Sequence, residues 1–281
     1  MRNSQTPLTT VELVEIRLRS DSRDMRAVLR EIMRLREIIS KADQLERSLA
    51  DWHGKDAALV FPTGFSSNDA TLQCLLRQIP DCVVISDERN HASIINGIRS
   101  TSCVRRVFRH NDVVQLEEIL AQYPSERPKI VVFESVYSMD GDVAPIAEIV
   151  ALARRYKAFT YLDEVHAVGI YGPDGAGMAA HLGIADQVDL IQGTMAKAVG
   201  VIGGYIAGAQ WLVDAVRSFA AGFIFTTALP PTVVAGCLAS VEHLRAQASE
   251  RNRLHTQTQR LRQSLAALRI PGGASLSRKQ I

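Results

Sequence analysis

The chain has 281 residues, of which 47% are hydrophobic and 22% are charged, as in an ordinary soluble globular protein. Its formal net charge of +2 is too small to indicate a nucleic-acid or membrane partner. The four cysteines stand far apart, without a CxxC pair or a histidine at metal-ligand spacing, so we predict reduced thiols, no metal site and no disulfide framework.

The N-terminal part is predicted to be helical. Residues 1–10 contain no apolar signal core, so we expect a cytoplasmic protein. Between residues 11 and 50, apolar side chains recur at spacings of three and four, which predicts one or two amphipathic helices. We therefore assign residues 1–50 to an N-terminal helical segment.

From Ala57 onward, short β-branched runs alternate with helical patterns. The runs are Cys82–Ser86, Lys129–Phe133, Thr160–Leu162, Val188–Ile191 and Gly204–Ala207, and the helical stretches include Ala92–Arg99, Val113–Tyr123, Ile146–Tyr156 and Trp211–Phe219. This alternation predicts an α/β domain, with a mostly parallel sheet covered by helices on both faces. Ligands of such sheets lie at the carboxyl ends of the strands. The longest apolar stretch, near 199–209, is too short for a membrane span of about 20 residues.

The C-terminal part begins as helix at about Val233 and continues with helical spacing over Arg251–Leu268. Residues 271–281 show no strand or core pattern. We predict a large domain over residues 51–245 and a helical remnant of a connection to a further domain over residues 246–281.

Two polar residues follow the run Thr160–Leu162. Asp163 comes directly after it, and a carboxylate at the end of a buried strand is costly unless a cation or a strong donor pairs with it. His166 lies three residues on, so both side chains can face one pocket. Alternatively, Asp163 caps the next turn and backbone groups satisfy His166.

Lys197 follows the run Val188–Ile191 and lies among small residues. A lysine at a mouth lined by small groups can lose solvation, which favours a Schiff-base nucleophile. Thr194 and nearby backbone amides could bind a phosphate. The alternative for Lys197 is an ordinary surface charge.

Two further segments complete a candidate site. In Phe61–Asn68, a turn rich in glycine and hydroxyl residues opens a predicted helix, which suits an anion at the helix N-terminus or is a simple N-cap. His91 follows the run Cys82–Ser86 and could stack on a ring-shaped cofactor, or could be a solvent-exposed residue at a helix start. A phosphate cradle, a buried carboxylate, a stacking ring and an amine nucleophile are together the parts needed to hold pyridoxal 5′-phosphate (PLP).

Seven ordered stretches carry a family resemblance. They are HGKDAALVFPTGFSSNDA, SDERNHASIINGIR, FRHND, FESVYSMDGD, YLDEVHAVGIYGPDGAG, GTMAKAVGVIGGYIAG and FIFTTALPP. From about Leu49 to Leu244 the chain resembles the α-oxoamine synthases, fold-type I PLP-dependent transferases, and within them the 5-aminolevulinate synthase pattern.

The resemblance implies a role for each matching residue. Lys197 would be the Schiff-base lysine, Asp163 would pair with the pyridine nitrogen, and His166 would hydrogen-bond the phenolic oxygen. His91 would stack on the ring, and Ser138 would line the pocket. The phosphate would lie against the backbone of Gly64 and Phe65 and against Thr194, and Thr226 would reach the phosphate of the partner subunit in a homodimer with shared active sites.

The resemblance also implies a reaction. It is the acyl transfer that condenses glycine with succinyl-CoA to 5-aminolevulinate, CoA and carbon dioxide, a step toward tetrapyrroles, porphyrins and haem. The expected partners are therefore these two small molecules and a second copy of the chain.

Two departures from the family pattern qualify this expectation. Family members carry a glycine-rich, substrate-contacting segment before HGK, but no glycine precedes His53 here. They also continue into a small C-terminal domain with a carboxylate-binding arginine, which we expect to be largely missing, so that arginine is unassigned. The alternatives are an α-oxoamine synthase for another acyl-CoA, or a catalytically silent homologue that binds PLP or an intact synthase subunit.

Overall fold

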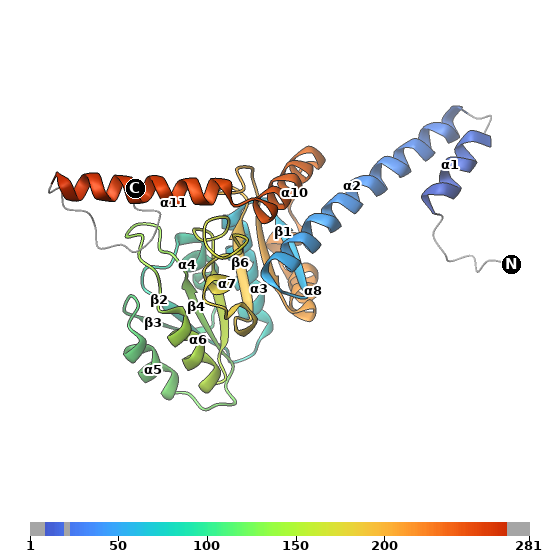
Figure 1. The fold of residues 1–281 in the computed structure, drawn as a ribbon. Coiled ribbons are helices and arrows are strands. Elements are labelled where there is room, and N and C mark those ends of the chain that lie inside the picture. Colours follow the sequence, from blue (N-terminus) through green and yellow to red (C-terminus); the bar gives the residue numbers. More distant parts are fainter. Residues whose placement is uncertain (1–8, 20–22, 269–281) are drawn as a thin grey trace.

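A seven-stranded sheet forms the centre of the computed structural model, which describes residues 9–19 and 23–268 (Figure 1). The strands are β1 (Ala57–Phe61), β2 (Val83–Asp87), β3 (Val104–Phe108), β4 (Lys129–Glu134), β5 (Phe159–Asp163), β6 (Leu190–Thr194) and β7 (Gly204–Gly208). Their order across the sheet is β1-β7-β6-β5-β4-β2-β3. Strand β7 is antiparallel to both of its neighbours, and the other paired strands are parallel. The prediction of a mostly parallel sheet is therefore confirmed.

Helices connect and cover the strands. They are α1 (Thr10–Arg19), α2 (Arg23–His53), α3 (Gly64–Gln78), α4 (Ala92–Arg99), α5 (Val113–Ala121), α6 (Ile146–Arg155), α7 (Met178–His181), α8 (Gln210–Phe219), α9 (Ala221–Ile224), α10 (Pro231–Ala246) and α11 (Ser249–Ala267). A 3₁₀ turn spans Ala185–Gln187. The four helices predicted between the strand runs are α4, α5, α6 and α8, and their boundaries are confirmed to within two residues.

The core lies on both faces of the sheet because neighbouring strand residues point to opposite sides. On β2, Val83 and Ile85 pack toward α5 and α6, whereas Val84 packs toward α3 and α4. A third apolar cluster joins the end of α2 to α10 and to the strands β1 and β7. Three of the four cysteines are buried, Cys103 is half-buried, and all four are free in the structure.

The strand predictions were incomplete at the two edges of the sheet. Strand β1 was not predicted, and β3 was not predicted because the exposed Arg105 and Arg106 interrupt its apolar pattern. The run Val188–Ile191 was placed too early, since the 3₁₀ turn occupies the residues before Val188 and β6 begins only at Leu190. Thr194 therefore ends the strand instead of following it.

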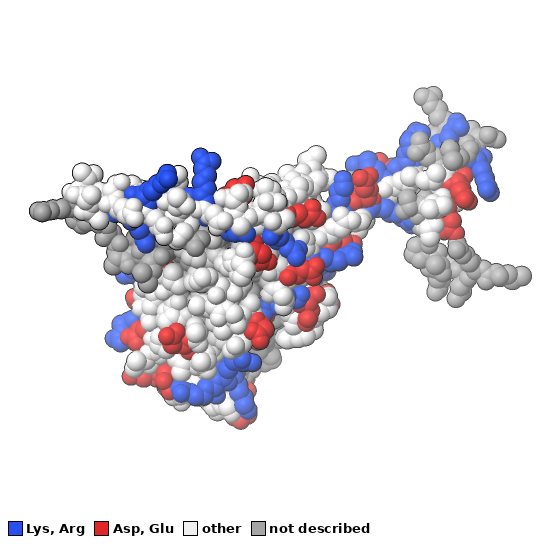
Figure 2. Space-filling model, viewed as in Figure 1, with Lys and Arg blue, Asp and Glu red and all other residues white. Residues whose placement is uncertain are grey.

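The terminal helices project from this body. Figure 1 shows α2 running away from the sheet, with α1 beside its far end. Thr9 and Glu12 exchange hydrogen bonds that cap α1, and Leu45 and Leu49 at the other end of α2 are fully buried against the body. The prediction of one or two helices within residues 11–50 is confirmed, and the structure has two, α1 and α2. Figure 2 shows acidic and basic side chains interspersed along α2.

Helix α11 is anchored at its start by the buried Arg251, whose guanidinium donates hydrogen bonds to the carbonyl oxygens of Leu244 and Pro173. The predicted helix over 251–268 is confirmed, and the tail 271–281 lies outside the described residues. The division at residues 50 and 245 remains a prediction. Among the described helices, no segment combines the length and the apolar character that a membrane crossing requires.

Candidate active site

One pocket opens at the carboxyl ends of the strands. Its lining comes from the starts of α3 and α4 and from the ends of β4, β5 and β6, and consists of Gly64, Phe65, Asn68, His91, Ser93, Glu134, Asp163, Val165, His166, Thr194, Ala196 and Lys197. Seven of the nine predicted site residues are in this set. The predicted position, at the carboxyl edge of the sheet, is where the structure brings them together.

Asp163 is the buried carboxylate of the pocket, with 4% of its surface exposed. Burial raises the pKa of Asp163, and a hydrogen bond from Asn68, the backbone N–H of Val165 and the nearby His91 and Lys197 act in the opposite direction. The Val165 N–H lies 2.9 Å from Asp163 Oδ1. Both interpretations of Asp163 therefore apply, because it caps the following turn with one oxygen and faces the pocket.

Asn68 connects this carboxylate to two other elements. Its Nδ2 donates to Asp163 Oδ2 at 2.8 Å and to Ser93 Oγ at 3.0 Å, while its Oδ1 accepts a hydrogen bond of 2.8 Å from the Tyr161 hydroxyl. Asn68 is 1% exposed, and both polar atoms of its side-chain amide are paired in this way. The network fixes the start of α3 against β5 and α4.

The start of α3 forms a cradle with the end of β6. Thr63 caps the helix, since its Oγ1 accepts from the Ser66 N–H at 3.0 Å and its own N–H donates to Ser66 Oγ at 3.1 Å. A Cβ added to Gly64 would lie 2.9 Å from Thr194 Oγ1, so only glycine leaves the space between helix and strand open. Backbone N–H groups at such a helix start suit an anion.

His91 is the exposed N-cap residue of α4, and it also lines the pocket. Its backbone N–H donates to Glu134 Oε1 at 2.6 Å, and its Nδ1 lies 2.7 Å from Ser93 Oγ. The alternative that His91 starts a helix in contact with solvent is thus correct, and it is compatible with a position at the pocket mouth. The ring's stacking role remains a prediction.

Lys197 and His166 follow the neighbouring strands β6 and β5. Lys197 is exposed and His166 is half-buried, and both line the pocket. The expectation that small neighbours remove Lys197 from solvent is not met in this chain, because the turn that carries it stands at the surface. Its amine is accessible for attachment of a carbonyl compound.

Ser138 and Thr226 are exposed and lie outside this set of lining residues. Ser138 is in the loop between β4 and α6, and Thr226 follows α9. Their predicted roles at the cofactor therefore remain predictions.

In the part of the chain that the structure describes, no cluster of three histidine, cysteine or acidic side chains has the arrangement of a metal site.

Sequence reasoning assigned no role to Asn68, Ser93 or Glu134. Asn68 lies four residues after Gly64, so helical spacing places it on the same face as the cradle. Glu134 ends the apolar run Lys129–Phe133, in the same position relative to β4 that Asp163 has relative to β5. That shared position, a carboxylate at the end of a buried strand, was the signal for Glu134.

The sequence pattern of the family "Aminotransferase class I and II" matches residues 30–280. Because this match covers most of the chain, including every residue of the pocket, the chain belongs to the class I and II aminotransferase family.

Curated relatives give a narrower similarity. The chain is 55% identical over 231 residues to the mitochondrial 5-aminolevulinate synthase of Schizosaccharomyces pombe, covering 82% of this chain and 41% of that protein. It is 54% identical over 227 residues to the 5-aminolevulinate synthase of Rhizobium meliloti, covering 81% of this chain and 56% of that protein. The chain thus spans about half the length of the curated relatives it matches.

Solved structures confirm the fold-type I PLP-transferase fold. A serine palmitoyltransferase with a PLP internal aldimine has a TM-score of 0.79 at 36% identity, covering 84% of this chain and 58% of that chain. Serine palmitoyltransferase of Sphingomonas wittichii has a TM-score of 0.77 at 33% identity, covering 81% and 57%. The resemblance predicted from the sequence motifs and the predicted fold class are both confirmed.

Proposed function

We propose that this chain provides the PLP-binding part of a 5-aminolevulinate synthase, the acyltransferase that condenses glycine with succinyl-CoA to 5-aminolevulinate, CoA and carbon dioxide. The observation that carries the proposal is the convergence of Lys197, Asp163, His91 and the Gly64 cradle on one pocket. The identity of about half of all aligned residues with 5-aminolevulinate synthases supports the choice of substrates over those of other acyltransferases.

The donors of the pocket fit PLP. The dianionic phosphate of PLP needs hydrogen-bond donors. The backbone N–H groups of Gly64 and Phe65, at the start of α3, and the hydroxyl of Thr194 would supply them. The space that a Cβ at Gly64 would fill is open on the side of Thr194. A buried carboxylate, Asp163, is present for a protonated ring nitrogen, and an exposed amine, Lys197, is present for the aldehyde.

Each side chain then has a defined task. PLP, when bound, supplies an electron-accepting ring that stabilises a carbanion at the amino acid's α-carbon. The Asp163 carboxylate would pair with the ring nitrogen and favour its protonated form, and Asn68 and the Val165 N–H keep that carboxylate in place. His166 would hydrogen-bond the phenolic oxygen, and His91 would stack on the ring.

Lys197 has two tasks at one atom. Its Nζ would hold the cofactor through the aldehyde and, as a free amine, would accept the proton from the glycine α-carbon. The exposed position of Lys197 leaves room for this exchange. The residues that bind the carboxylates of the substrates remain unassigned.

The shared-site homodimer is part of the proposal. Ile224 and Phe225, directly before Thr226, are 45% and 85% exposed, and Phe219, at the end of α8, is 60% exposed. Large apolar side chains gathered at one surface segment favour a protein partner there. A second copy that covers this segment would bring Thr226 into the interface, which is what a role for Thr226 across the dimer requires.

We also retain two further proposals, that Ser138 lines the cofactor pocket and that the protein is cytoplasmic.

The test is an absorbance spectrum of the purified chain with PLP, before and after glycine, for the unmodified chain, Lys197→Ala and the control Lys41→Ala, which removes a lysine of α2 outside the pocket. We expect an absorbance band at about 420 nm that shifts when glycine is added. The band should be retained in Lys41→Ala and absent in Lys197→Ala. Release of CoA from succinyl-CoA, compared with other acyl-CoAs, then tests the substrates. A missing band in the unmodified chain would contradict cofactor binding, and a band without CoA release would favour the silent homologue.

A further inference from the structure

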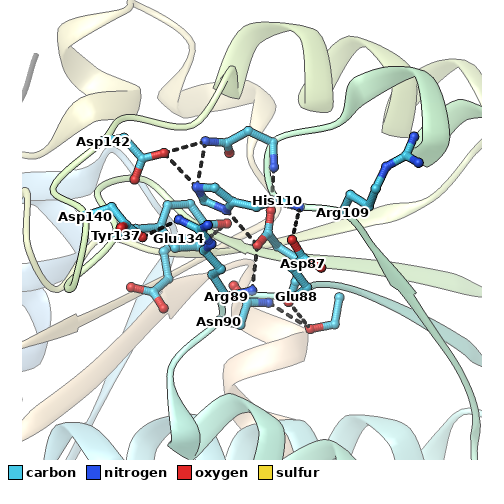
Figure 3. Close-up of polar contacts among 12 residues, drawn as sticks. Asp87, Glu88, Arg89, Asn90, Arg109, His110, Glu134, Tyr137, Asp140 and Asp142 are labelled. Carbon is cyan, nitrogen blue, oxygen red and sulfur yellow. Dashed lines mark hydrogen bonds and ion pairs between the residues drawn. The ribbon is translucent and has the colours of Figure 1, made fainter. Parts of the chain in front are cut away.

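His110 lies between two carboxylates beside the pocket (Figure 3). Its Nδ1 is 3.0 Å from Asp87 Oδ1, at the end of β2, and its Nε2 is 2.6 Å from Asp142 Oδ2, in the loop between β4 and α6. His110 itself follows β3. One imidazole ring therefore joins three segments that leave the carboxyl edge of the sheet.

This geometry favours a proton on each ring nitrogen. Asp87 Oδ1 faces Nδ1 and Asp142 Oδ2 faces Nε2, and a neutral imidazole donates from one nitrogen only. The side-chain amide of Asn111, 3.1 Å from Nε2, donates to the same Asp142 oxygen at 2.8 Å. Burial acts to lower the pKa of His110, but the hydrogen bonds and charges of Asp87 and Asp142 outweigh it and raise that pKa above its ordinary value. The His110 side chain is 11% exposed and that of Asp87 is fully buried, so water screens the pair poorly.

The charged and titratable groups around His110 come from every segment packed against it. After β2, Glu88 Oε1 accepts the His110 backbone N–H at 3.0 Å, and Arg89 pairs with Asp140 of the β4–α6 loop. On its own segment, Arg109 pairs with Asp112 at 2.5 Å. These two cations are already engaged by other carboxylates, so loss of the His110 proton would leave Asp87 and Asp142 without the cation that lies between them.

Two short routes connect His110 to the pocket. The first route runs through Asp87, whose Oδ1 also accepts a hydrogen bond of 2.8 Å from the backbone N–H of Arg89. Arg89 precedes His91 by two residues. On the second, the Tyr137 ring packs edge-on against His110 at a centroid distance of 4.4 Å, and the Tyr137 hydroxyl accepts the Glu134 N–H at 3.3 Å. Glu134 Oε1 then accepts the His91 N–H at 2.6 Å.

We propose that His110, as an imidazolium, is a positioning residue that ties the 135–143 loop to the end of β2 and so fixes His91 at the mouth of the pocket. The importance of His91 rests on the proposed function, whereas the ion-pair network exists in the chain without cofactor. Deprotonation of His110 removes the link between the two carboxylates, which repel one another, and both loops loosen. Ligand binding to the pocket then weakens as the pH rises above the folded-state pKa of His110.

Hydrogen–deuterium exchange of the whole chain without cofactor tests the network. It compares the unmodified chain, His110→Gln and the exposed-histidine control His255→Gln at pH 6, 7.5 and 9, after correction for intrinsic exchange. We expect peptides covering 87–95 and 135–143 to exchange about tenfold faster at pH 9 than at pH 6 in the unmodified chain and in His255→Gln. In His110→Gln they should exchange rapidly at every pH. Unchanged protection in His110→Gln would overturn the proposal.

Asp142→Asn provides a second variant that retains the ring. Loss of one carboxylate lowers the pKa of His110, so the pH midpoint of loop exchange should move to lower pH; an unmoved midpoint would also overturn the proposal. The affinity for PLP at each pH tests the link to the pocket. Equal pH dependence in the unmodified chain and His110→Gln would refute that link, whereas absence of PLP binding in all variants would refute the proposed function and leave the exchange result decisive for the network.

Discussion

Asn68 Nδ2 donates a hydrogen bond of 2.8 Å to Asp163 Oδ2, although the two residues lie 95 positions apart in the chain. The contact joins the second turn of α3 to the end of β5. Because both side chains are buried, the amide replaces the water that would otherwise solvate the carboxylate. The carboxylate assigned to the cofactor's ring nitrogen thus depends on a residue from another element.

Asn68→Ala should lower the free energy of unfolding by about 1–3 kcal/mol at pH 7, because it removes the buried hydrogen bonds that Asn68 makes to the Tyr161 hydroxyl and to Asp163 Oδ2. Chemical denaturation measures this change. The control is Asn96→Ala, where the amide donates to Asp69 at the exposed surface, and it should change stability by no more than about 0.5 kcal/mol. Equal effects of the two substitutions would contradict the role given to Asn68.

Gly64→Ala should weaken PLP binding at least about tenfold, because the new Cβ meets Thr194 Oγ1 at 2.9 Å and helix and strand must separate. The affinity for PLP is measured by following the absorbance band at about 420 nm as PLP is added. Gly236→Ala is the matched control, since Gly236 lies in the interior of α10 with its nearest neighbouring atom 4.0 Å from the added Cβ. It should leave the affinity unchanged and raise the free energy of unfolding by about 0.5–1 kcal/mol.

The buried His53 should make stability depend on pH. Burial and the positive charge of Lys55 lower the pKa of His53 to about 3, and its Nε2 lies 2.8 Å from the Tyr205 hydroxyl. The folded state thus holds neutral His53 where the unfolded chain binds a proton. The contribution of neutral His53 to stability is therefore complete above about pH 6.5, the pKa of histidine in the unfolded chain. This contribution declines as the pH falls below that value.

His53→Gln should therefore flatten the pH dependence of the unfolding free energy between pH 7 and 5. The difference in unfolding free energy between His53→Gln and the unmodified chain should change with pH, with a slope that approaches about 1.4 kcal/mol per pH unit near pH 5. Denaturant titrations at several pH values measure the slope. The exposed His181→Gln should follow the unmodified chain, and parallel curves for all three proteins would show that His53 does not carry the effect.

Phe225→Ser should weaken self-association of the chain at least about tenfold, because it removes the most exposed large apolar side chain of the segment 219–225. Sedimentation over a range of concentrations measures the dissociation constant. Val114→Ser, at a site 70% exposed on α5, removes a comparable apolar surface elsewhere and should leave association unchanged. Equal association of all three proteins would place the contact on another face.

The alternating pattern of apolar runs and helices correctly indicated the sheet's character and the positions of α4, α5, α6 and α8. These elements bury apolar side chains on one or both faces, so their periodicity is visible in the sequence. Strand β3 was missed because an edge strand with Arg105 and Arg106 facing solvent has no such apolar run. The antiparallel direction of β7 could not be predicted from the sequence, since a strand's direction follows from its connections and not from its composition.

Five site residues (His91, Asp163, His166, Thr194 and Lys197) were found from their positions after predicted strands, because a polar side chain there stands out against apolar neighbours. Gly64 and Phe65 were found from the turn, rich in glycine and hydroxyl residues, that opens a predicted helix. The sequence by itself therefore determined the fold class, the family and the residue types that a PLP site requires. Tertiary structure alone decided which distant groups support them, namely Asn68 at Asp163, Glu134 at His91, and His110 between Asp87 and Asp142. These contacts form between loops that different strands bring to one edge of the sheet, and their distances depend on how the strands pack, which local sequence patterns do not encode.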